Sequence, residues 1–519
     1  MNNKISKMYK MINSSNLRVV LESILVGGIA GLIVSIYRLT LKYINVYTTL
    51  AYDFMRVHWV YIILGLVILM GIGYIVGYMV KKDSMISGSG IPQIEGILTG
   101  YFKSNSPLKI LINKFIGGVL AIGSGLSLGI EGPSIQLGAS FANFFGDITK
   151  RLKLEKRFLI SSGAGAGLAA AFNAPFAGVM FVLEEVHKKF TPILFVSAIA
   201  ASVTSDVVTW AFFGRKPILE VEGIIAIPFK YYLFLIALGI VVGVAGAFYN
   251  YVLIKTINLY EKIKVSLPIR MMIPFVVAMF FGLFLPEVLG GGNELINQIL
   301  VNGVILKFAI VLLIGKFVFS MISFASGTPG GILFPLLTLG ALIGIIFGEC
   351  SIQFLGVDEI YLINFILLAM AGMFASIVRA PITGLVLVCE MSGSFTEFGS
   401  IVLVCGVSYL VAELLKSDPV YESLFKLRLK SQNGNLKYEN NSEIMIAYTV
   451  SMGSKIAGRK LREINLPENA LVVSIEREGD TIIPNGDTVI MAGDCINALV
   501  NESKEIILRK KLEQLCDLS

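Results

Sequence analysis

The stretch SLGIEGPSIQLG, residues 127–138, places one carboxylate, Glu131, between two glycines at the start of an apolar run. Proline is favoured in the first turn of a helix, so Pro133 predicts that a helix begins here. A carboxylate inside a membrane costs several kcal/mol if it is charged and unpaired. Glu131 is therefore a candidate functional residue if this helix is membrane-embedded.

The composition places the helix in a membrane. Hydrophobic residues make up 55% of the 519 residues, charged residues 15%, and the mean hydropathy is +0.77. Runs at 59–80 and 231–253 are long enough to cross about 30 Å of hydrocarbon as helices. Shorter runs bounded by Gly and Pro, at 133–146 and 334–348, predict half-helices packed inside protein. We expect an all-α polytopic membrane protein with broken helices.

Charge and residue usage narrow the class of function. The net charge is +7, and the first eighteen residues are basic without an acidic residue, which predicts a cytoplasmic N-terminal segment, 1–18. No basic stripe with interleaved aromatic residues indicates a nucleic-acid polymer as partner. The five cysteines lack paired spacing, so we expect no disulfide, metal site or other cofactor. HExxH does not occur, and neither His58 nor His187 has an evident serine partner in the sequence, so we do not expect an enzyme.

The chain contains an internal repeat. Three blocks recur in the same order, with offsets of 202, 202 and 206 residues: 88–98 with 290–300, 132–146 with 334–348, and 173–185 with 379–391. Small residues recur in any membrane protein, but the shared order favours two halves, at about 19–215 and 230–425. The pattern alone does not distinguish parallel from inverted halves.

Three glycine-rich segments precede apolar helices, at 88–92, 129–133 and 330–335. A helix N-terminus carries about half a positive charge and free N–H donors, so converging N-termini can hold a small anion. The alternative is that these turns only start helices. At an anion site an ionised Glu131 would compete with the anion, and its protonated form would leave, so protonation could gate anion access.

In these residues the chain resembles the CLC family of chloride channels and chloride/proton antiporters. The motifs that carry the resemblance, over residues 19–428, are GSGIP (88–92), KFIGG (114–118), GIEGP (129–133), GGILFP (330–335) and Tyr421 of DPVYESL. The resemblance implies an inverted-repeat fold and a homodimer in which each subunit holds its own pore. Ser89 is the choice typical of chloride-selective members.

The resemblance also implies roles for individual residues. It assigns chloride binding to Ser89, Gly129, Ile130, Ile332, Leu333 and Tyr421. Glu131 matches the external gating glutamate, and Glu185 matches the internal proton-transfer glutamate of the antiporters. Channel members commonly lack a carboxylate there, so chloride and protons are the expected substrates.

Two of these residues have an alternative interpretation, and two depart from the family pattern. Glu185 could instead be a helix-end charge reaching cytoplasmic water, as its neighbour Glu184 could be, and the chain would then be a passive voltage- or ligand-gated channel. Lys114 could act electrostatically on the gating region or extend to an interface. Ile130 stands where the family usually has Arg, and Leu333 where it usually has Phe.

The composition changes after residue 428. A polar linker, 429–443, leads to a small α+β module, 444–519. The patterns predict strands and helices in the order strand 444–450, helix 455–464, strand 470–476, strand 488–500 and helix 502–515.

This module resembles the TrkA-C domain. Such domains pair as dimers, and several bind small regulators such as cyclic di-AMP. Arg459, Lys460 and Arg462 are the nearest candidates for a phosphate-bearing ligand. A dimer clamp without a ligand, and a solvated basic face, are the alternatives. The module indicates a bacterial plasma-membrane protein with both termini cytoplasmic.

Overall fold

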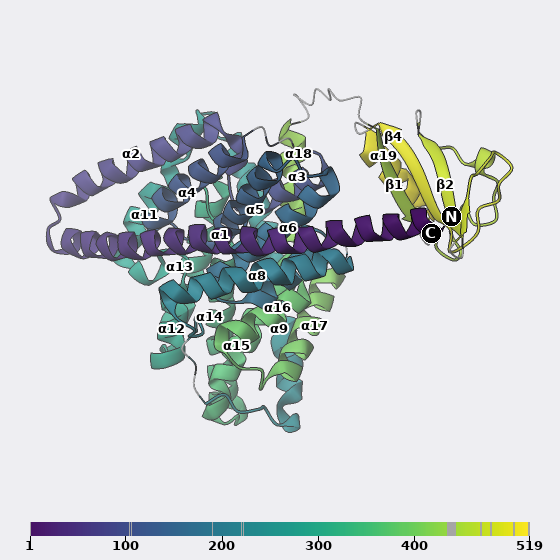
Figure 1. Cartoon of the computed structure of the whole chain (residues 1–519). Helices are drawn as coiled ribbons and strands as arrows, with labels where there is room; N and C mark the ends of the chain where they lie inside the picture. The colour runs from purple at the N-terminus through teal and green to yellow at the C-terminus, as the bar shows by residue number, and fades with distance from the viewer. Residues whose placement is uncertain are drawn as a thin grey trace. The chain divides into compact units, whose positions relative to one another are not determined.

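The computed structural model describes the backbone of residues 2–516, apart from a set of excluded positions: 103, 105, 189, 220, 222, 433–442, 468–469, 478–479 and 502–503. The chain divides into two compact units, Met1–Arg428 and Leu429–Ser519 (Figure 1). Most of the predicted linker, 429–443, lies outside the described residues.

The first unit is helical. Its helices are α1 (Asn2–Val57), α2 (Tyr61–Lys82), α3 (Ile91–Thr99), α4 (Pro107–Gly123), α5 (Glu131–Ile148), α6 (Lys153–Phe172), α7 (Pro175–Phe181), α8 (Pro192–Phe213), α9 (Tyr232–Lys262), α10 (Leu267–Arg270), α11 (Met272–Phe284), α12 (Asn293–Asn302), α13 (Leu306–Ala325), α14 (Leu333–Leu355), α15 (Leu362–Val378), α16 (Pro381–Ser392), α17 (Phe398–Leu414) and α18 (Val420–Gln432). In the described part of the chain, eight helical segments are long and apolar enough to cross a membrane, which confirms the polytopic prediction.

One detail differs from expectation. The run at 334–348 is not a short half-helix, since α14 has 23 residues and is long enough to cross a membrane. The sequence between Leu333 and Leu355 has no proline after its first turn to interrupt the helix. Helix α1 is continuous from Asn2 to Val57, so the predicted N-terminal segment, 1–18, has no helix break at its boundary.

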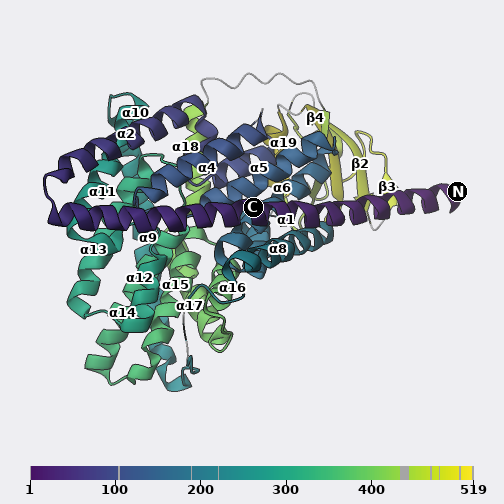
Figure 2. The same cartoon turned by 60° about the vertical axis from the view of Figure 1, so that its left-hand side comes forward.

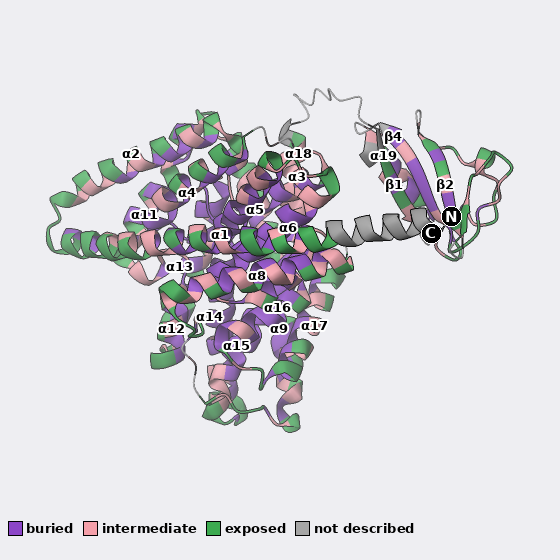
Figure 3. Ribbon diagram, in the orientation of Figure 1, coloured by how far each residue is buried: buried purple, intermediate pink, exposed green. Residues whose placement is uncertain are grey.

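Buried residues are concentrated in α5 and α14, which follow glycine-rich segments, and in the next helices, α6 and α15. Figure 3 shows these four helices largely buried, and it shows α2 and the C-terminal end of α1 largely exposed. Helix α1 packs against α4, α5 and α6 and also against α8 (Figure 1, and Figure 2 from another side). The exposed side chains of α1 and α2 are mainly apolar, as lipid-facing helices require.

The two halves make reciprocal contacts. The Gly88 N–H donates to the Gly327 carbonyl at 3.1 Å, and the Gly290 N–H donates to the Gly125 carbonyl at 3.0 Å. Each residue of the second bond lies 202 positions from its counterpart in the first, with the roles of the halves exchanged. The repeats are therefore related by a local two-fold axis, as inverted repeats are when that axis lies in the membrane plane.

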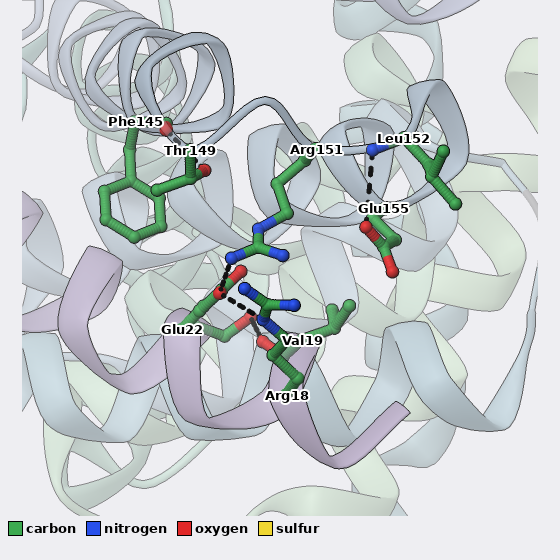
Figure 4. A network of polar contacts seen from close by, with 9 residues as sticks. Arg18, Val19, Glu22, Phe145, Thr149, Arg151, Leu152 and Glu155 are labelled. Atoms are coloured by element: carbon green, nitrogen blue, oxygen red, sulfur yellow. Dashed lines mark hydrogen bonds and ion pairs between the residues drawn. The ribbon is translucent and has the colours of Figure 1, made fainter. Parts of the chain in front are cut away.

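A polar cluster holds α1 to the connection between α5 and α6 (Figure 4). The Glu22 carboxylate accepts from Arg18 at 3.3 Å on its own helix, and from Arg151 at 2.5 Å across to that connection. Glu155 accepts from the Leu152 N–H at 3.3 Å and caps the start of α6. Glu22 and Arg151 are both largely buried, and Arg151 depends on Glu22 for its charge partner, whereas Glu22 also pairs with Arg18.

The second unit is an antiparallel sheet with one helix. Its elements are β1 (Glu443–Thr449), β2 (Leu471–Arg477), β3 (Asp480–Ile482), β4 (Cys495–Asn501) and α19 (Glu505–Cys516), with strand order β1-β4-β2-β3. Helix α19 packs against β1 and β4. The core is apolar and includes Ile446, Ile475, Ile496, Leu508 and Leu512. The predicted α+β class is confirmed.

Inside this unit the predicted helix over 455–464 is wrong. Gly458 has a φ of 85°, in the left-handed region, which ends any helix, and only a single 3-10 turn at Leu461–Glu463 follows. Lys460 instead forms a backbone bridge with Val489. The predicted strand 488–500 begins only at Cys495.

An ion pair closes the loop before β4. Arg477 donates to both carboxylate oxygens of Asp494 at 2.8 Å. These bonds lower the pKa of Asp494, and the Met491 N–H adds a third donor at 2.7 Å. Sequence patterns did not single out this pair.

We predict that Glu22→Gln destabilises the membrane unit by about 3 kcal/mol, because it leaves Arg151 largely buried without a counter-charge. The matched control is Asp147→Asn, which breaks the more exposed pair with Lys156 near the same connection and should cost about 1 kcal/mol or less. Thermal unfolding of the purified protein in detergent measures both. Equal losses would contradict this account of Glu22.

Candidate functional site

Glu131 is the first residue of α5, beside a short antiparallel bridge between the two repeats. The Gly129 N–H donates to the Gly331 carbonyl at 2.8 Å, and the Gly331 N–H donates back to the Gly129 carbonyl at 2.7 Å. A Cβ atom on either glycine would overlap the Glu131 carboxylate. The site therefore requires glycine at both positions. The Gly129 N–H, at a predicted chloride-binding residue, is committed to this bridge and is not free to bind an anion.

The Glu131 side chain is fully buried at the N-terminus of α14. Its Oε1 accepts from the Leu333 N–H at 2.6 Å and the Phe334 N–H at 3.3 Å. These amides are at the positive end of the helix dipole, where an anion is stabilised. The Leu333 amide, predicted to bind chloride, thus holds the carboxylate of Glu131.

The neighbouring predicted residues lie at the same helix ends. Ile332 immediately precedes α14 and is buried, and Ile130 immediately precedes α5 and is half-buried. The carbonyl of Ile130 accepts from the N–H and the hydroxyl of Ser134. Ile130 therefore supplies a backbone carbonyl for the first turn of α5, and it places no charged side chain at this helix end.

Two buried hydroxyl groups complete the set. Ser89 precedes α3, where its Oγ accepts from the Ile91 N–H at 3.3 Å, and its Cα and Cβ pack against Gly132. Tyr421, near the start of α18, is 0% exposed, and its hydroxyl has no hydrogen-bond partner in the described chain. Tyr421 lies within electrostatic range of both Glu131 and Glu185. A buried hydroxyl without a partner is suited to a ligand.

Lys114 does not extend to an interface. It is 0% exposed, and its Nζ donates to the carbonyls of Ile86 at 2.9 Å and Gly88 at 2.6 Å, in the loop that leads to Ser89. Its counterpart, Lys316, lies 202 residues later and was not among the predicted site residues. Lys316 donates to Val288 at 3.0 Å and Gly290 at 2.7 Å, the repeat-related carbonyls. The repeat alignment contained this signal.

Glu185 lies in a short π-helical segment, Val182–Val186, that continues α7. It is 4% exposed, which does not fit a charge reaching cytoplasmic water. The nearest cation is Lys188, whose Nζ is 3.7 Å from Glu185 Oε1, and no hydrogen bond to this oxygen occurs in the described residues. A buried carboxylate with so little compensation is a functional candidate.

Glu184 is not a solvated charge either. Its carboxylate caps α16 of the other repeat, accepting from the Ile382 N–H at 3.2 Å and the Thr383 N–H at 2.6 Å. Its counterpart, Glu390, caps α7 through Phe176 at 3.0 Å and Ala177 at 2.8 Å. This reciprocal capping ties the two repeats together and fixes the segment that carries Glu185.

The three basic residues predicted as ligands in the second unit, Arg459, Lys460 and Arg462, do not form a helical face, because the expected helix is absent. The side chains of Lys460 and Arg462 both pair with Asp487 at 3.1 Å, and Arg459 is exposed. A phosphate-bearing ligand there would compete with Asp487. No cluster of three or more metal-ligating side chains occurs in the described part of the chain.

These features define a class of protein. A polytopic helical unit whose halves are related by a two-fold axis, with helix ends meeting at a buried carboxylate, belongs to the inverted-repeat membrane transport proteins. The family model "Voltage gated chloride channel" matches residues 72–413, and the TrkA-C domain model matches residues 445–504. The chain belongs to the voltage gated chloride channel family, which confirms the predicted resemblance and fold class.

Several known proteins are similar to this chain. The H(+)/Cl(-) exchange transporter ClcA of Vibrio parahaemolyticus is 31% identical over 432 residues, covering 80% of this chain and 91% of the relative. That of Vibrio cholerae is 34% identical over 369 residues, covering 70% and 78%. The crystal structure of a slow cyanobacterial Cl−/H+ antiporter superposes with a TM-score of 0.77 at 27% identity, covering 80% and 99%.

We predict that Lys114→Met and Lys316→Met each lower stability by about 2 kcal/mol, because each removes two hydrogen bonds from a buried ammonium group to backbone carbonyls. Only Lys114→Met should also weaken chloride binding, by about tenfold, since Lys114 supports the loop of Ser89. Thermal unfolding and calorimetric chloride titration distinguish these effects. Equal weakening of chloride binding by both changes would refute a specific role for Lys114.

Proposed function

We propose that this chain exchanges chloride for protons across a bacterial plasma membrane, as a transporter and not an enzyme. The observation that carries the proposal is the Glu131 carboxylate on the amides of Leu333 and Phe334. An ionised carboxylate and a chloride ion cannot occupy the same donors. Protonation of Glu131 removes the charge that holds it there and frees the amides for chloride. Proton binding and chloride binding are thereby coupled at one place.

The remaining chloride ligands in the proposal are the hydroxyls of Ser89 and Tyr421 and the amide of Ile332, with Ile130 at the outer side. The unpartnered, buried hydroxyl of Tyr421 supports this assignment. Neutral donors suit transport, because they bind an anion without a full counter-charge that would slow its release.

Glu185 is the proposed internal proton site and Glu131 the external gate. Two observations support a connection between them: both are buried carboxylates, and Tyr421 is within electrostatic range of each. The ClcA relatives carry the name of H(+)/Cl(-) exchangers, which supports exchange over passive conduction. Both termini are placed on the cytoplasmic side in this proposal, and the functional unit is a homodimer formed through both units.

The proposal includes regulation through the TrkA-C unit by a small ligand such as cyclic di-AMP. Helix α18 provides a physical connection, because it carries Tyr421 and also Arg428. The Arg428 guanidinium donates to the Ser84 carbonyl at 2.5 Å, in the loop before Ser89. A ligand that binds two arrangements of α18 unequally would therefore act on both chloride-binding hydroxyls.

Saturating cyclic di-AMP should change the chloride flux and raise the unfolding temperature of the full-length protein, with AMP as the control nucleotide. Substituting both Lys460 and Arg462 with methionine should remove the response, since these are the basic candidates beside Asp487. No change in flux or unfolding temperature with the wild-type protein would eliminate this ligand.

The transport proposal predicts that a chloride gradient drives protons in the opposite direction in liposomes whose voltage is clamped with valinomycin. Glu185→Gln should abolish the proton movement and leave chloride flux within a few fold, because glutamine cannot exchange a proton. Glu131→Gln should abolish proton movement and make chloride flux insensitive to pH. A pH electrode and a chloride electrode record both fluxes.

Glu349→Gln is the matched control, because Glu349 is an exposed carboxylate on α14, far along the helix from the amides that hold Glu131. It should leave both fluxes unchanged. Chloride flux without proton movement in the wild-type protein would identify a passive channel and end the exchange proposal.

A further inference from the structure

Lys188 lies between two acidic side chains at the end of the segment that carries Glu185. Its Nζ is 2.8 Å from Glu95 Oε1, within hydrogen-bond distance, and 3.7 Å from Glu185 Oε1, beyond it. Glu95 Oε2 and Glu185 Oε1 have no hydrogen-bond partner in the described chain. One ammonium group therefore lies between two carboxylates, and its contact with Glu95 is the shorter one.

The charged groups around Glu185 come from several elements. Those that act on its carboxylate are Lys188 and Glu184 on its own segment, Glu95 on α3, and Glu422 on α18, beside Tyr421. Helix α6, which also packs against this segment, contributes Ser161, whose hydroxyl bonds with His187 at 3.1 Å. Among these described groups Lys188 is the cation, and the other charged side chains, Glu95, Glu184 and Glu422, are acidic.

The backbone turns at Lys188. Its φ is 54°, in the left-handed region, and it directly follows His187, the residue that caps the end of the Glu185 segment. A left-handed residue at this position is a common way to end a helix. The turn places the ammonium between two carboxylates, one on α3, which begins beside Ser89, and one at the proposed proton site.

Resting on the proposed role of Glu185, we propose that Lys188 is a positioning residue for the proton step, shared between Glu95 and Glu185. When Glu185 is ionised, the three side chains carry one excess negative charge, and Lys188 is held mainly by Glu95. A proton on Glu185 removes this excess negative charge. Glu95 therefore promotes proton uptake by Glu185, because it holds the ammonium of Lys188 away from the Glu185 carboxylate. Lys188 opposes proton uptake by stabilising the ionised form.

This division of roles predicts shifts of opposite sign. The measured quantity is the pH at which chloride-driven proton movement falls to half its maximum as both solutions are made more alkaline together. Lys188→Met should move this midpoint up by about half a pH unit, because ionised Glu185 loses its cation. Glu95→Gln should move it down by a similar amount, because Lys188 becomes free to pair with Glu185 and a nearby negative charge is removed.

Three further variants separate charge from structure. Lys188→Arg should restore the wild-type midpoint, because it keeps the cation. Lys188→Gly, which favours the same backbone conformation without the ammonium, should match Lys188→Met. Lys156→Met, which breaks the pair with Asp147 between α5 and α6, should leave the midpoint unchanged.

Shifts of the same sign for Lys188→Met and Glu95→Gln, no shift in either, or loss of proton movement in all three Lys188 variants would overturn the proposal. The role of Glu185 is tested separately. If Glu185→Gln continues to move protons, the proposed function fails at that residue, whereas loss of proton movement in Glu185→Gln with unshifted Lys188 variants removes only the role of Lys188.

Discussion

The hydrogen bonds between the Glu131 carboxylate and the amides at the N-terminus of α14 are the interaction on which the proposed transport depends, because a carboxylate and a chloride ion cannot occupy the same donors. The amides of Leu333 and Phe334 are presented in a buried place where the Glu131 carboxylate binds them. Gly129 and Gly331 lack the Cβ atoms that would displace this carboxylate. In the function that we propose, the protonation of Glu131 decides whether the carboxylate or a chloride ion binds these amides, and this competition couples the two ions.

The two-fold relation between the repeats makes this arrangement rigid. Each half supports the other through equivalent contacts: Glu184 and Glu390 cap helices across the repeats, while Lys114 and Lys316 brace equivalent loops. Buried charges are costly unless they are well hydrogen-bonded, and these four are bonded to backbone groups. Glu185 differs from them, because its Oε1 has no hydrogen-bond partner in the described chain and the ammonium of Lys188 lies 3.7 Å away, which suits the proton exchange that we propose for it.

Sequence alone predicted the membrane class, the two halves, the glycine-rich helix starts and the α+β module. It did not predict that Glu184 and Glu390 cap each other's repeats, although their alignment was visible, because reciprocity requires knowing that the repeats face one another. The pairing of Lys188 with Glu95 joins residues 93 positions apart and depends on packing that no local pattern encodes. The helix predicted at 455–464 does not form, because Gly458 adopts a left-handed backbone that ends the segment.

The most direct test of the account is the location of a bound anion in crystals soaked in bromide, found by anomalous diffraction in the wild-type protein and in Glu131→Gln. Glutamine lacks the charge that competes with an anion, so the variant should show bromide at the amides of Leu333 and Phe334. The wild-type protein, with Glu131 ionised, should show none at that position. Equal bromide occupancy in both proteins would contradict the claim that carboxylate and anion compete for one site.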